Sequence, residues 1–423
     1  MSVATVPTRW SPWRTVAAFG LVSLSADMVY EGMRSVSGPF LGSLGASALT
    51  VGIVTGAGEA IALALRVVTG PLADRSGRYW GLTVLGYGMT AVCVPLLAVT
   101  PYLGAAGLAA ASILILLERT GKAVRSPSKS ALLAHMAKPV GRGRGMAVHK
   151  ALDQVGAFAG PLVVAGMLAL TGLYWPGFAL LAIPGLVAML LLAQLRRRTA
   201  LVDEGDHGEE PRAEHVVRRP ARLPRSFYAF ALSCAAGTLG LMTFGVISFH
   251  LVDAGLVGAA VVPVVYAMAM GLEAVAALAT GFAYDRVGHR VLLVLPLLIA
   301  VVPPLAFAGQ VWPALLGVAV WGFATGIQDS TVKALVADLV PASGLATAYG
   351  AFAAFQGAAA LGGGVLAGAL YADHLGALVA IVVALQVLSL VLLLVTPRLH
   401  ARGQPSVASG SGAARASRPN RNA

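Results

Sequence analysis

Charge is scarce in this sequence. Of its 423 residues, 11% are Asp, Glu, Lys or Arg, whereas 57% are hydrophobic, and the mean hydropathy is +0.80. Because soluble domains carry about 25% charged residues, this composition excludes an ordinary soluble fold and indicates a chain that lies in a membrane. Segments of alternating polarity, which a transmembrane barrel needs, are also missing. The long apolar runs therefore indicate membrane helices.

Cysteine and enzyme motifs are also scarce. Cys93 and Cys234 each lie inside an apolar run, so the sequence supports neither a disulfide framework nor a site of spaced thiolates. The HExxH, GxSxG and GxxxxGK[ST] motifs do not occur. We therefore expect no cofactor, no metal site, no enzymatic activity and no direct use of ATP. A membrane-embedded enzyme or a receptor is the less favoured alternative.

Apolar runs separated by turn residues fill most of the chain. An apolar helix of about 20 residues spans a bilayer, and the sequence predicts spans at 14–37, 49–72, 80–100, 103–128, 143–170, 173–194, 227–252, 257–282, 290–309, 312–338, 345–371 and 373–397. The first run carries charges and no small-residue cleavage site, so it is predicted to be a retained span and not a signal peptide. The expected fold class is an all-α membrane protein with twelve transmembrane helices in two pseudo-symmetric six-helix bundles.

Basic residues occur in alternate turns only. Lys and Arg are absent from 35–58, 79–117, 154–195 and 226–284. By the positive-inside rule the basic turns and both termini face the cytoplasm, as expected for a multi-pass protein of the cell membrane. The net charge of +12 then needs no nucleic-acid partner, and attraction to anionic lipid headgroups is the simpler interpretation.

Two polar segments divide the chain. Residues 195–226 mix both charge signs with Pro and Gly, and the tail 398–423 is basic and of low complexity. Neither has an apolar period, which is typical of flexible segments. We expect an amino-terminal bundle at 1–194, a cytoplasmic linker at 195–226, a carboxyl-terminal bundle at 227–397 and a cytoplasmic tail at 398–423.

The two halves repeat a charged turn. GPLADRSGRYW at 70–80 contains Gly70, Asp74, Arg75, Gly77 and Arg78, and GFAYDRVGHRV, from Gly281, contains Asp285, Arg286 and Gly288. Six-span repeats carrying this turn resemble the major facilitator superfamily over essentially the whole chain. The resemblance implies a transporter that binds substrate near the midplane and works by alternating access. It also implies that the turn residues latch the cytoplasmic side in the outward-open state. The simpler alternative is that they only hold the loop inside.

Two further stretches resemble motifs of that superfamily. GAFAGP, with Gly156, Gly160 and Pro161, is similar to a motif of its proton-driven exporters, although small residues at this spacing also serve ordinary helix packing. In the fourth span, Arg119 and Gly121 resemble the proton-transfer motif at altered spacing.

Ionisable residues inside the predicted spans are costly, by about 2.5–3.5 kcal/mol at a helix centre, and usually face a cavity or a partner. Four are predicted to couple protons: Asp27, Glu31, Glu59 and Asp153. The candidates for substrate contact or ion pairing are Arg34, Glu118, Arg119, Lys122, Arg125, Lys150, Glu273, Asp329, Lys333 and Gln356.

Opposite charges four residues apart favour structural ion pairs over transport roles. This applies to Glu118 with Lys122 and to Asp329 with Lys333, and Asp153 is expected to pair with a nearby base. Asp27, Glu31 and Glu59 have no base at i±4 in their own helix. They are therefore the better proton carriers, although Arg34 weakens the case for Glu31.

The predicted function is proton-coupled efflux, by antiport, of a small organic molecule such as a drug or metabolite, which includes multidrug export. The alternative is a proton-coupled uptake symporter for an organic anion, favoured by basic side chains in the first, fourth and fifth spans. The expected partners are a small-molecule substrate, protons and the lipid bilayer, and the protein is expected to be a monomer.

Overall fold

The computed structural model describes residues 10–203, 223–340 and 344–403. The first half contains α1 (Pro12–Ser43), α2 (Ala48–Ala64), α3 (Arg66–Ser76), α4 (Tyr79–Leu96), α5 (Gly107–Met136), α6 (Arg142–Thr171), α7 (Tyr174–Leu180) and α8 (Ala182–Asp203). The second half contains α9 (Arg225–Leu241), α10 (Phe244–Asp253), α11 (Val262–Val287), α12 (Val294–Ala306), α13 (Val311–Leu339), α14 (Leu345–Leu370) and α15 (Leu375–Gly403). Short 3₁₀ turns adjoin α4, α5 and α12.

These helices form twelve membrane crossings. Eleven segments of the described chain are long and apolar enough to cross a bilayer. The twelfth is α1, whose 32 residues include the charged Asp27, Glu31 and Arg34, which lower its hydropathy. Three of the crossings each consist of two consecutive helices: α2 with α3, α7 with α8, and α9 with α10. The all-α, twelve-helix fold class predicted from the sequence is confirmed.

The ends of two crossings differ from the sequence-based bounds. α8 continues to Asp203 and α15 to Gly403, so helix occupies the first part of the predicted linker and of the predicted tail. The rest of the linker, 204–222, and the rest of the tail lie outside the described residues. The apolar pattern ends earlier than the helices because polar residues can continue a helix beyond the bilayer core.

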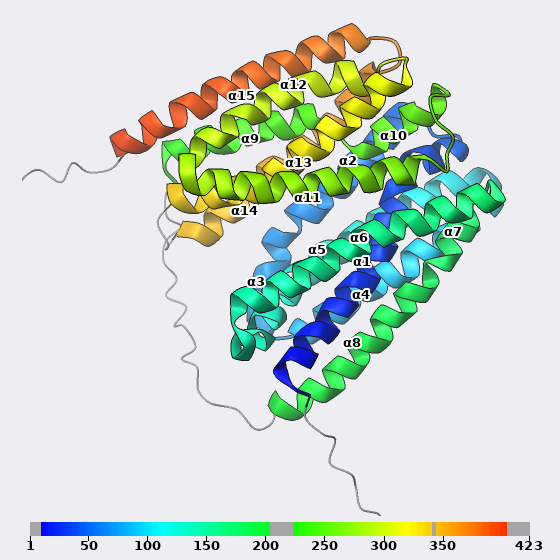
Figure 1. The fold of residues 1–423 in the computed structure, drawn as a ribbon, viewed down its shortest axis with the longest axis vertical. Coiled ribbons are helices and arrows are strands. Elements are labelled where there is room, and N and C mark those ends of the chain that lie inside the picture. Colours follow the sequence, from blue (N-terminus) through cyan, green and yellow to red (C-terminus); the bar gives the residue numbers. More distant parts are fainter. Residues whose placement is uncertain (1–9, 204–222, 341–343, 404–423) are drawn as a thin grey trace, which may run out of the picture.

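The two halves form two groups of helices (Figure 1). α1 packs along α6, and α2 packs along α14 of the other half. The start of α1 and the end of α15 lie toward the same side of the molecule, which we name the terminal end (Figure 1). The loop before α5 and the start of α11 lie toward the other side, the distal end.

Small residues hold the halves together toward the distal end. A Cβ atom at Gly38 would overlap the carbonyl oxygen of Gly245, and one at Gly52 would overlap that of Gly364. Beside these contacts the hydroxyls of Thr55 and Thr243 lie 2.7 Å apart. Such close backbone approach is how membrane helices gain packing energy without a hydrophobic driving force.

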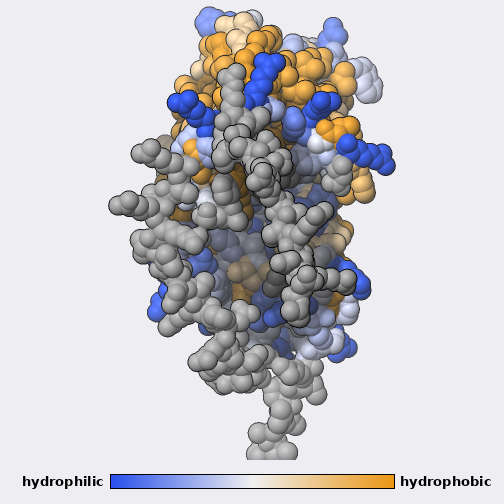
Figure 2. Space-filling view, turned by 90° about the vertical axis from the view of Figure 1, so that its left-hand side faces the viewer, coloured by the Kyte–Doolittle hydropathy of each residue, from blue (hydrophilic) through white to orange (hydrophobic). Residues whose placement is uncertain are grey.

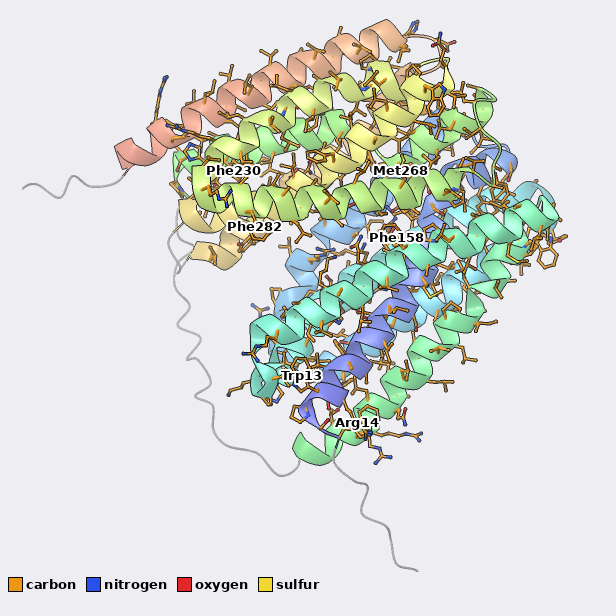
Figure 3. All side chains as sticks on the ribbon, in the orientation of Figure 1. Trp13, Arg14, Phe158, Phe230, Met268 and Phe282 are labelled. Atoms are coloured by element: carbon orange, nitrogen blue, oxygen red, sulfur yellow. The ribbon has the colours of Figure 1, made fainter. Side chains whose placement is uncertain are left out.

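The terminal end is more open. Phe282, near the end of α11, is 70% exposed, whereas Phe158 of α6 lies against Gly271 where α6 and α11 meet (Figure 3). Figure 2 looks onto this end and shows hydrophilic side chains among hydrophobic ones. The halves therefore close toward the distal end and part toward the terminal end.

Candidate functional site

A cavity of 240 Å³ lies between the two halves. Side chains from α1, α2, α3 and α5 line one wall, and side chains from α9, α11, α13 and α14 line the other. Its charged lining residues are Arg34, Glu59, Arg66, Lys122, Glu273 and Asp329. The cavity is open to its surroundings, so this volume is the room between the two walls and sets no upper limit on the size of a ligand.

Arg34 connects three groups at this cavity. Its Nη2 lies 3.0 Å from Oε1 of Glu59, and its Nη1 lies 3.7 Å from Oε2 of Glu31. Nη1 also donates a hydrogen bond of 3.1 Å to the hydroxyl of Tyr266 on α11, and that hydroxyl donates one of 2.5 Å to Glu31. Because Tyr266 belongs to the second half, the Glu31 carboxylate and Arg34 link the two halves.

A second arginine shares Glu59. Nη2 of Arg119 lies 3.6 Å from Oε1 of Glu59, and Nε lies 3.9 Å from Glu118. The guanidinium also donates to the hydroxyl of Tyr30 and lies 4.5 Å from the centre of that ring. Glu59 is thus held between two guanidinium groups, an arrangement in which opposite charges compensate each other away from water.

The predicted pair of Glu118 with Lys122 is wrong. Glu118 is fully buried, accepts a 3.0 Å hydrogen bond from Thr90 of α4 and lies 3.9 Å from Nη1 of Arg125. Nζ of Lys122 lies 3.7 Å from the centre of the Tyr30 ring. The carboxylate therefore points to α4 while the ammonium points to α1, where an aromatic face attracts it.

Farther toward the terminal end, α1, α5 and α6 enclose another polar cluster. Asp27 lies 3.9 Å from Arg125, and Asp153 lies 3.6 Å from Lys129 and 3.7 Å from His149. Asp153 thus has the nearby base that the sequence predicts. Lys129 is not among the predicted site residues, although it continues the spacing of Lys122 and Arg125 along α5. Lys150 is exposed on α6 and forms no ion pair with this cluster among the described residues, although its charge acts on His149 and Asp153.

The second half contributes a wall with amides and carboxylates. Thr238 donates a 2.7 Å hydrogen bond to Gln356 and accepts one of 2.6 Å from Gln328. Glu273 and Asp329 also line the cavity. The side chain of Lys333 lies outside the described part of the structure, so the predicted Asp329–Lys333 pair stays a prediction.

A helix break lies in the cavity lining. α9 ends at Leu241 and α10 begins at Phe244, and Met242 between them has φ +53° and ψ 178°. Non-glycine residues rarely take this strained conformation. The carbonyl of Met242 accepts a 3.4 Å hydrogen bond from Trp321. Irregular backbone at membrane depth is tolerated where it lines a cavity, as it does here.

The charged turns lie at the terminal end. Gly77 ends α3 with φ +64°, and Asp74 accepts a 3.0 Å hydrogen bond from Tyr79 within its own turn. Arg75 and Arg78 are exposed. A Cβ at Gly70 would meet nothing within 4 Å, so in this conformation no other helix packs closely against Gly70.

The second copy of the turn is similarly exposed. Arg286 is exposed, and Gly288 takes φ +65° after the end of α11. A Cβ at Gly281 would meet nothing within 4 Å. The side chain of Asp285 lies outside the described part of the structure.

Gly156 and Gly160 lie where α6 crosses α1. A Cβ at Gly156 would overlap the carbonyl oxygen of Leu24, and one at Gly160 would overlap that of Met28. Pro161, the next residue, is buried. The small residues therefore set the distance between α1, which carries Asp27 and Glu31, and α6.

We expect Gly160→Val to destabilise the protein by about 1–3 kcal/mol or more, because the added side chain must displace the α1 backbone. Thermal unfolding of the purified protein in detergent measures this effect. Gly166→Val is the matched control, since a Cβ at Gly166 of the same helix meets nothing within 4 Å. Equal stability of the two variants would contradict the packing role.

Comparison with known sequences shows the family to which the chain belongs. The profile of the Major Facilitator Superfamily matches residues 19–308 and 257–419. The chain belongs to this superfamily. A protein of Mycobacterium tuberculosis described as uncharacterized is 50% identical over 384 residues, covering 90% of this chain and 93% of the relative. An uncharacterized MFS-type transporter of Methanocaldococcus jannaschii is 25% identical over 370 residues, covering 85% of this chain and 88% of the relative.

Solved superfamily structures share the fold. A mutant form of the nucleoside transporter NupG matches with a TM-score of 0.68 at 12% identity and covers 91% of this chain and 99% of its own. A POT family transporter bound to a thioalcohol-conjugated peptide matches with 0.68 at 13% identity, covering 91% and 96%. The chain is a secondary transporter and not an enzyme, and the superfamily membership predicted from the charged turn is confirmed.

Proposed function

We propose that this transporter couples protons to the export of a small organic molecule, a metabolite or drug, across the cell membrane. The terminal end then faces the cytoplasm, and the present conformation is open inward. The observation that carries the proton coupling is the contact of Glu31 with both Arg34 and Tyr266. Among the four acids predicted to couple protons, Glu31 is the one whose hydrogen bond reaches the other half.

The charge of Glu31 affects how firmly the halves hold together. As a carboxylate it attracts Arg34 and accepts a hydrogen bond from the hydroxyl of Tyr266. A protonated carboxyl loses the ion pair, and a charge-assisted hydrogen bond is roughly twice as strong as a neutral one. Proton binding at Glu31 would therefore loosen one of the contacts between the halves, and proton release would restore it.

The other three acids are better suited to holding charges in place. Glu59 lies between Arg34 and Arg119, and Asp153 lies beside Lys129 and His149. Asp27 lies 3.9 Å from Arg125 within the first half. The ion-pair partners of these three acids all belong to the first half, so a change in their charge does not act directly on the contact between the halves, and we propose Glu31 ahead of Asp27 as the carrier.

The charged turns serve as the inner latch in this proposal. Asp74 binds Tyr79 inside its own turn, and Arg75, Arg78 and Arg286 are exposed. This is the expected state of a latch in a conformation that is open at the terminal end. In the outward-open conformation these residues would meet the other half.

We expect Glu31→Gln to abolish transport driven by a pH gradient while exchange of substrate without a gradient continues. Tyr266→Phe should slow both processes, because Arg34 and Glu31 lose their shared partner. Proton movement and substrate flux in proteoliposomes, with cationic, neutral and anionic compounds, measure both effects. Asp373→Asn, at an exposed acid in the turn before α15, is the control. Gradient-driven accumulation by Glu31→Gln would rule out Glu31 as the proton carrier.

Uptake symport of an organic anion is the second candidate. Arg66 and Lys122 favour it, since both line the cavity and neither has an ion pair with a carboxylate among the described residues. In the same proteoliposomes, antiport moves protons opposite to the substrate, whereas symport moves them with it.

A further inference from the structure

Opposite charges face each other across the cavity. The first-half wall presents Arg66 and Lys122, and the second-half wall presents Glu273. A pocket for a simple anion or a simple cation needs only one of these signs. Here both signs of charge are present, and they lie on separate walls. The lining therefore limits the class of substrate that the transporter proposed above can bind.

Among the described residues, neither Arg66 nor Lys122 of the first wall forms an ion pair with an acid, although Glu59 acts on both at longer range. Lys122 contacts the ring of Tyr30, and Glu118, on its own helix, contacts Thr90 and Arg125 instead. Glu59 is engaged by two arginines. Within the described residues, the buried Nε of Arg66 has no hydrogen-bond partner. This wall therefore offers positive charge to the cavity.

The second wall offers negative charge. Glu273 is partly exposed to the cavity and forms no ion pair with any described residue. Arg34 and Lys150 act on this carboxylate only at longer range, and Asp329 adds a like charge. A carboxylate within a span is costly without a direct partner. Asp329 lies on the same wall, but the side chain of Lys333, which follows it on α13, is not described, so the negative charge is assigned to Glu273.

The surface around these charges is aromatic and small. Trp321 and Phe352 line the second wall, and the cavity measures 240 Å³. Aromatic faces bind apolar groups and also attract ammonium groups. The site therefore combines two charged ends with an apolar surface and has room for a small molecule.

We propose that the substrate is a small zwitterion of amino-acid or dipeptide size. Its carboxylate binds at Lys122 and Arg66, its ammonium group binds at Glu273, and its apolar part lies on Trp321 and Phe352. A ligand of this kind bridges both halves, so binding draws them together around it. This assignment depends on the proposed transport function and adds the substrate class to it.

Matched compounds test the class. The probes are amino acids and dipeptides, each in its free, N-acetylated, methyl-esterified and doubly blocked forms, added at millimolar concentration to the purified protein in detergent. The rise in unfolding temperature gives the apparent affinity. At least one free zwitterion should bind, and each singly blocked form should bind about tenfold more weakly, because one charge-assisted contact is lost.

Two variants test which residues bind each charged end of the substrate. In the double variant Arg66→Gln/Lys122→Gln the methyl ester should bind as well as the free form, and in Glu273→Gln the N-acetylated form should do so. Lys122→Arg keeps the charge and should keep the wild-type order, which separates charge from folding. Arg144→Gln, at an exposed position at the start of α6, is the control.

The results discriminate between this assignment and the transport function. If the singly charged forms bind best, or if no free zwitterion binds, the assignment is wrong, while proton-linked transport of another compound would leave the proposed function intact. If zwitterions bind in the predicted order but their transport in proteoliposomes moves no protons, the proposed substrate class is supported and the proposed proton coupling is wrong.

Discussion

Replacing Arg119 with methionine should nearly abolish the folded transporter. Arg119 lies beside Glu59 and Glu118 and donates a hydrogen bond to Tyr30, all in the interior of the first half. Removing one partner of a buried ion pair costs about 3–5 kcal/mol, because the remaining charge stays uncompensated. Since proteins are stable by only about 5–15 kcal/mol, we expect little protein to survive extraction.

The measurement is the yield of monodisperse protein after extraction, together with its unfolding temperature. Arg197→Met, at an exposed arginine of α8, is the matched control and should have little effect. The double variant Glu118→Gln/Arg119→Met removes one charge of each sign and should recover part of the loss. If Arg119→Met is as stable as Arg197→Met, the network does not support the fold.

A disulfide between cysteines at positions 55 and 243 should block transport almost completely. The hydroxyls of Thr55 and Thr243 lie 2.7 Å apart and join the halves toward the distal end. Alternating access requires this contact to part when the site opens to the other side. A covalent bond there would hold the protein in the present conformation, and a reducing agent should restore transport.

The experiment needs a background without the native cysteines. Cys93 and Cys234 are buried and not paired with each other, so alanine at both positions is a mild change. Each single cysteine variant should transport normally under oxidation. If the oxidised double variant forms the disulfide and still transports, the halves do not separate at this contact during the cycle.

The course of the chain was largely predictable from the sequence. Apolar runs of bilayer length predict all twelve crossings, and glycines after the runs mark real helix ends, as at Gly77 and Gly172, which take φ +64° and +69°. The breaks between α2 and α3 and between α9 and α10 were not predicted. The break at Met242 has no local signal, because neither proline nor glycine stands at that position.

The candidate site was predictable in its members and much less in its pairings. Asp27, Glu31 and Glu59 stand out because their own helices offer no base at i±4, yet in the structure each lies near an arginine. Arg119 and Arg125 come from α5. Periodicity tells which residues share a helix face, but it does not tell which other helix that face meets.

Two tyrosines also have partners in the structure that the sequence did not predict. Neither Tyr30 nor Tyr266 is among the candidate site residues predicted from the sequence. In the structure the ring of Tyr30 receives Lys122 and Arg119, and the hydroxyl of Tyr266 joins Glu31 across the halves. A tyrosine reads as apolar in a hydropathy pattern, whereas its hydroxyl needs a partner once it is buried.

The sequence by itself determined the membrane class, the twelve crossings, the superfamily and the set of charged residues inside the bilayer. Each of these depends on the cost of placing polar groups in hydrocarbon, which composition and order along the chain reveal. The tertiary structure decided the partners of those charges, the link from Glu31 to Tyr266 and the opposite signs of the two cavity walls. These depend on which helices pack together, and residues far apart in the chain meet only through that packing.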